Sequence, residues 1–243
     1  MKEQFLVEVK DLRKRYSERN VVDGVSMVLN RNEIIGLLGP NGAGKTTTFY
    51  MIVGLISPDG GCVSFSGRDI THHPVFMRAR LGMGYLPQEP SVFRKLTVRE
   101  NVISILEIIE KNSARRNERA DSLLGDLGLL RVADQKAYTL SGGERRKLEI
   151  CRSLVMNPSV LMLDEPFSGV DPIAVQDIQR IIRLLRDKGM GIIITDHNVR
   201  ETLSVVDRAY LLYEGRILRE GISSFLIQDE MSRNLYLGRE FKM

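Results

Sequence analysis

A glycine-rich segment near residue 40 has the residue types that bind phosphate groups. It lies between a short apolar run, residues 34–38, and a helix-like stretch, residues 46–56. This order of strand, loop and helix is typical of a phosphate-binding loop, in which backbone N–H groups and the positive end of the helix face the anion. The residues in it are Gly39, Pro40, Asn41, Gly42, Ala43, Gly44, Lys45, Thr46 and Thr47. We expect Lys45 to meet the β- and γ-phosphates of a nucleotide and the Thr46 hydroxyl to ligate Mg²⁺.

Two adjacent carboxylates, Asp164 and Glu165, directly follow the apolar run at residues 160–163. In open α/β sheets ligands bind at the carboxyl ends of the strands, which is where these side chains are expected to lie. Alone, such a pair is more often a solvated turn. Together with the phosphate-binding loop, it predicts that Asp164 holds Mg²⁺ and that Glu165 orients and deprotonates an attacking water molecule.

The elements that must position these residues are typical of an α/β fold. Four apolar runs, residues 34–38, 160–163, 191–195 and 209–213, are continuous rather than alternating, which indicates parallel strands covered by helices on both faces. Helix-like stretches lie between them, and one of them, residues 174–189, ends in Lys188 and Gly189 as a helix C-terminus does.

Two other kinds of segment flank this core. The first ~30 residues and residues 62–70 alternate between apolar and polar residues, which predicts antiparallel strands added to the sheet. The region from about 90 to 157 has helical periodicity, which predicts an inserted helical subdomain. We therefore expect one domain: an α/β core with its antiparallel strands at 1–89 and 158–225, a helical subdomain at 90–157, and a tail at 226–243.

Composition excludes several classes of protein. The 243 residues are 43% hydrophobic, which is enough for a core without disulfides or metals, and Cys62 and Cys151 lack metal-binding spacing, so both are interpreted as packed thiols. A net charge of +4 is far from the dense basic face of a nucleic-acid binder. The basic stretches at 114–119 and 145–147 are interpreted as solvated helix faces.

No signal peptide or apolar run of about 18 residues is present, so we expect a cytoplasmic protein that reaches a membrane only through partners.

The segment Leu140-Ser141-Gly142-Gly143-Glu144 resembles the signature motif of ABC ATPases, which are P-loop NTPases with a RecA-like core. Other elements of that family occur in the expected order at Tyr16, Gln88, residues 168–172 and His197. The resemblance covers nearly the whole chain. It implies that Tyr16 stacks on the adenine of ATP, that Gln88 senses Mg²⁺ and the attacking water, and that His197 contacts the γ-phosphate.

In this family the signature motif acts on the nucleotide of a second subunit. The resemblance implies that Ser141, Gly142 and Gly143 close over the γ-phosphate bound by the partner and that Asp171 connects the two sites. It therefore implies a head-to-tail homodimer with two ATP molecules between the subunits. Glu144 stands where most members have glutamine, which puts a negative charge near that interface.

Longer stretches are similar to the ATPase subunits of lipopolysaccharide transport systems, namely residues 86–101, 164–179, 195–203 and 236–243. This resemblance implies a peripheral subunit on the cytoplasmic face of the inner membrane that drives two permease subunits. Phe93 and Arg94 would line the groove that receives a permease helix, although Phe93 could instead pack locally. The tail residues Tyr236, Leu237 and Phe241 could contact the opposite subunit or could fray.

Three alternatives are weighed against this interpretation. An importer ATPase of the branched-chain amino acid class has a segment close to residues 164–172, but the tail and residues 195–198 argue against it. A soluble ABC protein of DNA repair or translation would need a long coiled coil or two ATPase domains in one chain. A small-molecule kinase with a phosphate-binding loop would need an acceptor pocket and lid arginines in place of the signature motif.

Overall fold

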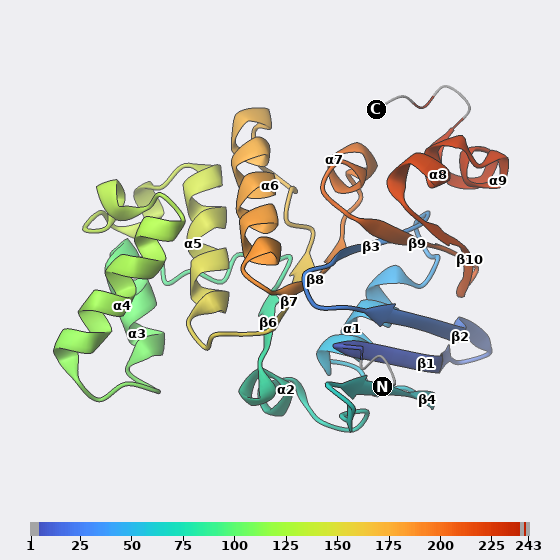
Figure 1. The fold of residues 1–243 in the computed structure, drawn as a ribbon, viewed down its shortest axis with the longest axis horizontal. Helices are drawn as coiled ribbons and strands as arrows, with labels where there is room; N and C mark the ends of the chain where they lie inside the picture. Colours follow the sequence, from blue (N-terminus) through green and yellow to red (C-terminus); the bar gives the residue numbers. More distant parts are fainter. Residues whose placement is uncertain (1–4, 239–240, 242–243) are drawn as a thin grey trace.

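A computed structural model describes residues 5–238 and residue 241 of the protein. Its central element is a six-stranded sheet in the order β10-β9-β3-β8-β7-β6 (Figure 1). The strands β6, β7, β8, β3 and β9 are parallel neighbours, and β10 pairs antiparallel with β9 at the edge. Their bounds are β3 Ile34–Leu38, β6 Met83–Leu86, β7 Val160–Asp164, β8 Gly191–Thr195, β9 Arg208–Tyr213 and β10 Arg216–Gly221.

The antiparallel strands form a second sheet in the order β2-β1-β4-β5. Their bounds are β1 Val7–Tyr16, β2 Arg19–Leu29, β4 Gly60–Phe65 and β5 Arg68–Asp69. The prediction that these strands join the main sheet is therefore wrong. Helix α1 (Lys45–Val53) lies between the two sheets, and side chains from both sheets and from α1 form one buried cluster (Figure 1). A helix with apolar residues around most of its surface needs such cover on both sides.

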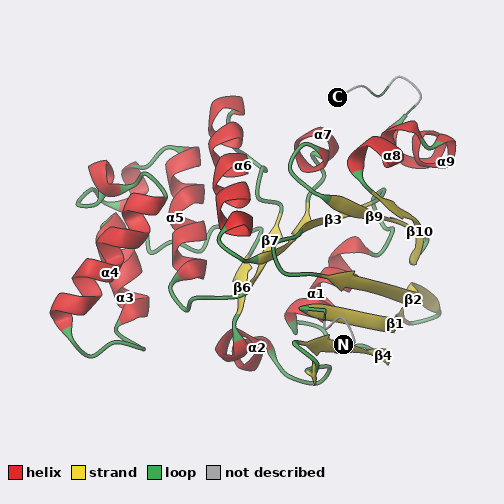
Figure 2. Ribbon diagram, viewed as in Figure 1, coloured by secondary structure: helices red, strands yellow, loops and turns green. Residues whose placement is uncertain are grey.

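The remaining helices lie around the main sheet, with α3 and α4 on the far side of α5 from α6 (Figure 2). Besides α1, they are α2 Val75–Leu81, α3 Val98–Leu106, α4 Ser113–Asp126, α5 Gly142–Leu154, α6 Pro172–Asp187, α7 Val199–Leu203, α8 Ser223–Gln228 and α9 Glu230–Ser232, followed by a π-helical turn, Arg233–Leu237. The sequence predicted α1 and α3 to α6. It did not predict the short helices α2, α7, α8 and α9, which bury few side chains and so have weak periodicity.

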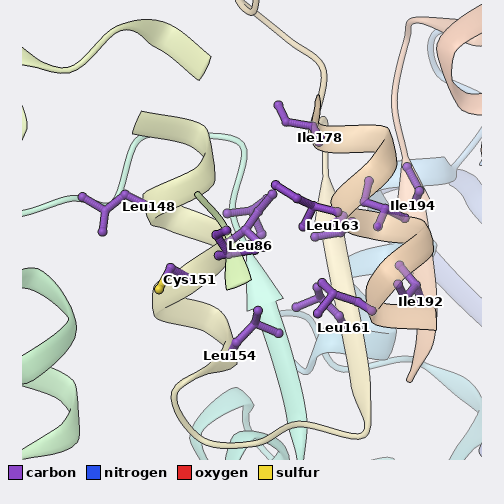
Figure 3. Packing of buried hydrophobic residues seen from close by; sticks show 14 of the residues in the cluster. Leu86, Leu148, Cys151, Leu154, Leu161, Leu163, Ile178, Ile192 and Ile194 are labelled. Carbon is purple, nitrogen blue, oxygen red and sulfur yellow. The ribbon is translucent and has the colours of Figure 1, made fainter. Parts of the chain in front are cut away.

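Alternate residues of each central strand face two different cores. On β3, Ile34 and Leu38 belong to the core beneath α5 and α6, whereas Ile35 and Leu37 belong to the core around α1. The same alternation holds on β7 and β8. Figure 3 shows Leu161, Leu163, Ile192 and Ile194 of these strands beneath Cys151 and Leu154 of α5 and Ile178 of α6. Because both faces are buried, the strands are apolar throughout, which is why the sequence predicted parallel strands.

Helices α3 to α5 share the core of α6 and the sheet, rather than having one of their own. The predicted architecture, with an α/β core, an antiparallel β part and a helical part, is confirmed. The division of the chain at residues 90 and 157 stays a prediction. Helix α3 buries Val98, Val102 and Leu106 on one side, and Ile108, just after its end, is 78% exposed.

The last residues that the structure describes contact the main core. Tyr236, Leu237 and Phe241 are partly buried against it, and burial raises the pKa of the Tyr236 hydroxyl to about 12. Of the two alternatives for these residues, fraying does not fit this packing, and contact with an opposite subunit stays a prediction. Within residues 5–238, none of the helices has the length and apolar character needed to cross a lipid bilayer.

Candidate functional site

The phosphate-binding loop joins β3 to α1 and is shaped by its own backbone. Gly39 has φ 144° and Gly44 has φ 98°, and a Cβ atom at these residues would lie 2.2 Å from the Leu212 carbonyl oxygen and 2.5 Å from the Val21 carbonyl oxygen, respectively. Only glycine fits such positions. Gly44 is the N-cap of α1, and no side chain among the described residues caps this end. The N–H groups of the first turn of α1 therefore face the loop, as an anion site requires.

Lys45 extends across the inside of this loop. Its Nζ donates hydrogen bonds to the carbonyl oxygens of Gly39 at 2.6 Å and Pro40 at 2.9 Å. Burial lowers the pKa of Lys45, and the nearby Glu165 charge partly opposes this. Thr46, which follows on the first turn of α1, is exposed, and Thr47 is half-buried. The structure thus places an ammonium group and a hydroxyl group at the mouth of the loop.

Asp164 is the last residue of β7 and is 2% exposed. No hydrogen-bond donor in the described part of the chain reaches its Oδ2 atom. Burial raises the pKa of Asp164 to about 6, and the charge of Glu165 acts in the same direction. A buried carboxylate oxygen without a partner fits a divalent cation, which prefers oxygen ligands. Residues 5–238 hold no cluster of three or more His, Cys, Asp or Glu side chains that could bind a metal without help from a ligand.

Gln88, Glu165 and His197 meet at a single oxygen atom. Gln88 Nε2 donates to Glu165 Oε2 at 3.0 Å, and His197 Nδ1 lies 3.2 Å from the same oxygen. The backbone of Glu165 has φ 47°, and its N–H donates to the Thr195 carbonyl at 2.7 Å, which ties the start of this loop to β8. A left-handed conformation costs a residue with a side chain about 1 kcal/mol. The three residues that the sequence proposed for catalysis come from three separate loops and converge here.

Sequence reasoning missed two buried residues that hold these loops, Arg146 and Asp196. Arg146 was interpreted as part of a solvated face, but it is 6% exposed and donates to the carbonyl oxygens of Asp164 at 2.8 Å and Glu165 at 2.9 Å. It also donates to the Pro87 and Pro166 carbonyls and to the Glu149 carboxylate. It lies three residues after the buried Gly143 and four before Ile150, a helical spacing that could have revealed its burial.

Asp196 immediately precedes His197 and is 1% exposed. Its carboxylate accepts hydrogen bonds from the backbone N–H groups of Phe167 at 3.0 Å and Asn198 at 2.7 Å. Burial raises its pKa, and these two hydrogen bonds oppose that effect. Asp196 therefore connects the loop after β7 with the loop that carries His197.

The signature residues start α5 in the helical part. Ser141 is the N-cap, and its side chain and that of Glu144 form a capping box. A Cβ atom on Gly143 would lie 2.4 Å from Ala174 Cβ on α6, and one on Gly142 would lie 3.3 Å from the Gly169 carbonyl oxygen. The motif is therefore packed closely against the start of α6.

Asp171 is the N-cap of α6, where its carboxylate accepts from the N–H groups of Ile173 and Ala174 at 3.1 and 3.0 Å. The sequence had proposed a role between subunits for this residue. Capping α6 is a structural role that the sequence reasoning did not include.

Within one chain the helices that begin at the two parts of the predicted site pack in different cores. Helix α1, which begins at the phosphate-binding loop, belongs to one core, and α5, which begins at the signature motif, belongs to the other. Alternate strand residues face these two cores, so the two helices cover opposite faces of the sheet.

Comparison with known proteins decides the family. Residues 22–168 match the ABC transporter family. The chain is 51% identical, over 98% of its length and 99% of the relative, to the lipopolysaccharide export system ATP-binding protein LptB of Acidithiobacillus ferridurans. It is 50% identical to the protein of that name from Escherichia coli strain K12, over 96% of this chain and 98% of the relative. A solved ATP-binding cassette of an ABC transporter, in its ADP conformation, superimposes with a TM-score of 0.86 at 29% identity and covers 97% of this chain and 99% of that chain.

The chain belongs to the ABC transporter family. It is an ABC ATPase, as the sequence predicted, and it binds ATP. In this ATPase the hairpin of β1 and β2 borders the phosphate-binding loop, because Arg19 approaches Gly42 and the Val21 carbonyl approaches Gly44. Tyr16, which pairs with Arg19 in that hairpin, is 46% exposed, and Lys14 Nζ lies 5.6 Å from its ring centroid. Its stacking on adenine stays a prediction.

The two residues proposed to bind a permease lie before α3 in the ATPase. Phe93 is 50% exposed, and the Arg152 guanidinium covers part of its ring at 4.6 Å from the centroid. Arg94 is exposed, and its carbonyl oxygen accepts from Tyr138 N–H at 3.1 Å. Phe93 therefore packs locally on one side while half of its surface stays accessible, and its contact with a permease stays a prediction.

Proposed function

We propose that this ATPase powers lipopolysaccharide export, by coupling ATP binding and hydrolysis to removal of lipopolysaccharide from the inner membrane. The observation that carries this proposal is identity of about half, over 96–98% of the chain, to two export ATPases from different organisms. A match that extends through the tail argues for a specific transport system, because nucleotide chemistry alone does not require a particular tail. Neither the structure of the site nor its charge favours one of the alternative functions.

The proposed hydrolysis uses residues that converge at the end of β7. Glu165 accepts a proton from the attacking water, and Gln88 and His197, both beside its Oε2 atom, orient the water and the γ-phosphate. Asp164, Thr46 and Gln88 would hold Mg²⁺, which supplies charge stabilisation to the phosphates. Arg146 donates to the backbone carbonyl oxygens of Asp164 and Glu165 and so holds these two residues in place. The Lys45 ammonium would release its hydrogen bonds to the Gly39 and Pro40 carbonyl oxygens and bind phosphate oxygens instead.

The proposed working unit is a homodimer with two permease subunits in the inner membrane. The helices α1 and α5 lie on opposite faces of the sheet, which supports a site in which the signature residues of one chain act on the nucleotide of another. Two chains related head to tail would do so, with Ser141, Gly142, Gly143 and Glu144 facing the partner's nucleotide. Closure on ATP and reopening after hydrolysis would then move permease helices docked near Phe93 and Arg94 on the cytoplasmic face.

Purification of the tagged chain from detergent-solubilised native membranes tests the assignment. Two permease subunits of a lipopolysaccharide exporter are expected in the purified complex, identified by mass spectrometry. Amino acid permeases in their place would replace the export function with import, and ribosomes or DNA would contradict both. Phe93→Ala should reduce the permease yield, whereas the control Phe225→Ala, a similarly exposed aromatic residue on α8, should not.

A further inference from the structure

The glutamate of the signature motif is held at both of its carboxylate oxygens. Arg131 Nη2 donates to Glu144 Oε1 at 2.9 Å. Glu144 Oε2 accepts from the Ser141 hydroxyl at 2.8 Å and from the Ser141 backbone N–H at 3.1 Å. The Glu144 side chain is only 18% exposed, whereas that of Arg131 is 75% exposed. The exposed arginine thus pairs with a largely covered carboxylate.

These contacts occupy the one proton that the Ser141 hydroxyl can donate. Its oxygen also accepts from the Glu144 backbone N–H at 3.3 Å. A phosphate can receive a hydrogen bond from this hydroxyl only after the hydroxyl leaves Glu144. A carboxylate accepts such a bond roughly twice as strongly as a neutral amide oxygen would. Glutamate in place of glutamine therefore makes the release of Ser141 harder.

The charge of Glu144 is also unfavourable for an approaching phosphate. The Ser141 hydrogen bond lowers the pKa of Glu144, and the charges of Arg131 and Lys147 lower it further, so the group is a carboxylate at neutral pH. Arg131 offsets this charge and draws electron density away from the oxygen that holds Ser141. Loss of Arg131 would strengthen the hydrogen bond between Glu144 and Ser141 and would leave Lys147 alone to offset the negative charge that the phosphate approaches.

We propose that Arg131 is a positioning residue that acts through Glu144. It sets the ATP concentration at which the Ser141 hydroxyl gives up its hydrogen bond to Glu144 and donates to the partner's γ-phosphate instead. This inference rests on the proposed two-chain site. Arg131 lies in a turn, Leu130–Val132, that follows α4, and neither its residue type nor its position belongs to the nucleotide motifs of the sequence. Its effect is on closure of the dimer rather than on the chemical step.

The chain provides a matched control for this proposal. Arg131 and Arg180 line the same cavity between α4, α5 and α6, and their side chains are 75% and 78% exposed. Arg180 pairs with Asp177 at 2.9 Å instead of with Glu144. Arg131→Gln and Arg180→Gln therefore remove the same charge from the same cavity, and only the first removes the contact with the signature motif.

The experiment measures ATP-dependent dimerisation by light scattering in the Glu165→Gln background, together with KM and kcat in the hydrolysing protein. Arg131→Gln should raise the half-saturating ATP concentration about two- to five-fold, the range expected for an exposed charge pair. The shift in KM should exceed any change in kcat, and it should shrink at 0.5 M salt because the pair is screened. Arg180→Gln should give no shift.

Combination with Glu144→Gln decides whether Arg131 acts through Glu144. Glutamine keeps the capping box, so α5 should remain intact. Arg131→Gln added to Glu144→Gln should cause no further shift. The inference would be overturned if Arg131→Gln shifted the half-saturating ATP concentration equally with Glu144 and with Glu144→Gln, or caused no shift when Glu144 is present. Either result would leave the two-chain site in place. Failure of the Glu165→Gln parent to dimerise at saturating ATP would instead overturn the proposed site, and this inference with it.

Discussion

The phosphate-binding loop is shaped by its backbone, whereas the signature motif is shaped by side chains that can exchange partners. In the phosphate-binding loop, Gly39 and Gly44 lie so close to carbonyl oxygens of neighbouring strands that a Cβ atom would not fit. The helix that follows this loop lies between the two sheets. In the signature motif, Ser141 is exposed and is fixed by hydrogen bonds to Glu144, which in turn pairs with Arg131. A loop with a fixed backbone suits the first binding of the phosphates. Hydrogen bonds that can change partners suit the signature motif, which in the proposed dimer contacts the nucleotide only on closure.

Glu165, the proposed general base, lies in neither region, and its substitution should give the largest effect because loss of a general base acts on the chemical step itself. Glu165→Gln keeps the oxygen near Gln88 and His197 but removes the base, so turnover should fall about 10²- to 10⁴-fold, while ATP binding is retained. ATPase assays and calorimetric titration with ATP measure the two properties. Near-normal hydrolysis would refute Glu165 as the base.

Arg146 should give the largest effect on folding. Arg146→Met removes the cationic partner of the buried Glu149 carboxylate and one donor from each of four backbone carbonyls, so the free energy of unfolding should fall by about 3–5 kcal/mol. Denaturant titration measures the change. The neighbouring Arg145→Met should cost much less, and equal losses for the two variants would show that the buried network is not the cause.

Glycine substitutions test the contrast between the two regions directly. Gly39→Ala forces a side chain into a left-handed conformation and against the Leu212 carbonyl, so unfolding free energy should fall by at least about 1–3 kcal/mol and ATP binding should weaken. In Gly142→Ala the new Cβ atom would lie 3.3 Å from the Gly169 carbonyl oxygen, a tight contact, but the backbone conformation is ordinary, so the free energy of unfolding should fall by less than in Gly39→Ala. Comparable destabilisation by the two variants would contradict a difference in backbone constraint between the regions.

The smallest effect concerns the pH dependence of the free protein. The pKa of Asp164 is raised in the folded chain to about 6, above its ordinary value, so the folded state holds this proton more tightly than the unfolded state. The protonated Asp164 carboxyl therefore contributes to the free energy of unfolding at low pH, and this contribution is lost as pH rises through 6. Relative to Asp164→Asn, the nucleotide-free protein should lose about 1 kcal/mol between pH 5 and pH 8. A pH-independent difference in thermal unfolding between the two proteins would argue against a raised pKa.

The arrangement of the core was largely predictable, and its exceptions have identifiable causes. Strands buried on both faces produce continuous apolar runs, so β3, β7, β8 and β9 could be predicted from local sequence. The antiparallel strands were also detected, but their sheet was not, because alternation specifies one buried face and does not specify what covers it. Arg146 was misjudged because a charged residue is normally exposed, and only a count of helical spacing places it on the buried stripe of α5.

By itself, the sequence determined the chemistry of the site: a phosphate-binding loop ending in Lys45 and Thr46, a strand ending in Asp164 and Glu165, and a signature motif at the start of a helix. These are local patterns, in which a few consecutive residues fix both the backbone and the reactive groups. Only the tertiary structure decided that Gln88 and His197 meet one oxygen of Glu165, that Arg146 and Asp196 hold their loops, and that Arg131 reaches Glu144. Such contacts join residues from different elements, and their formation depends on how the helices pack on the sheet, which no single segment encodes.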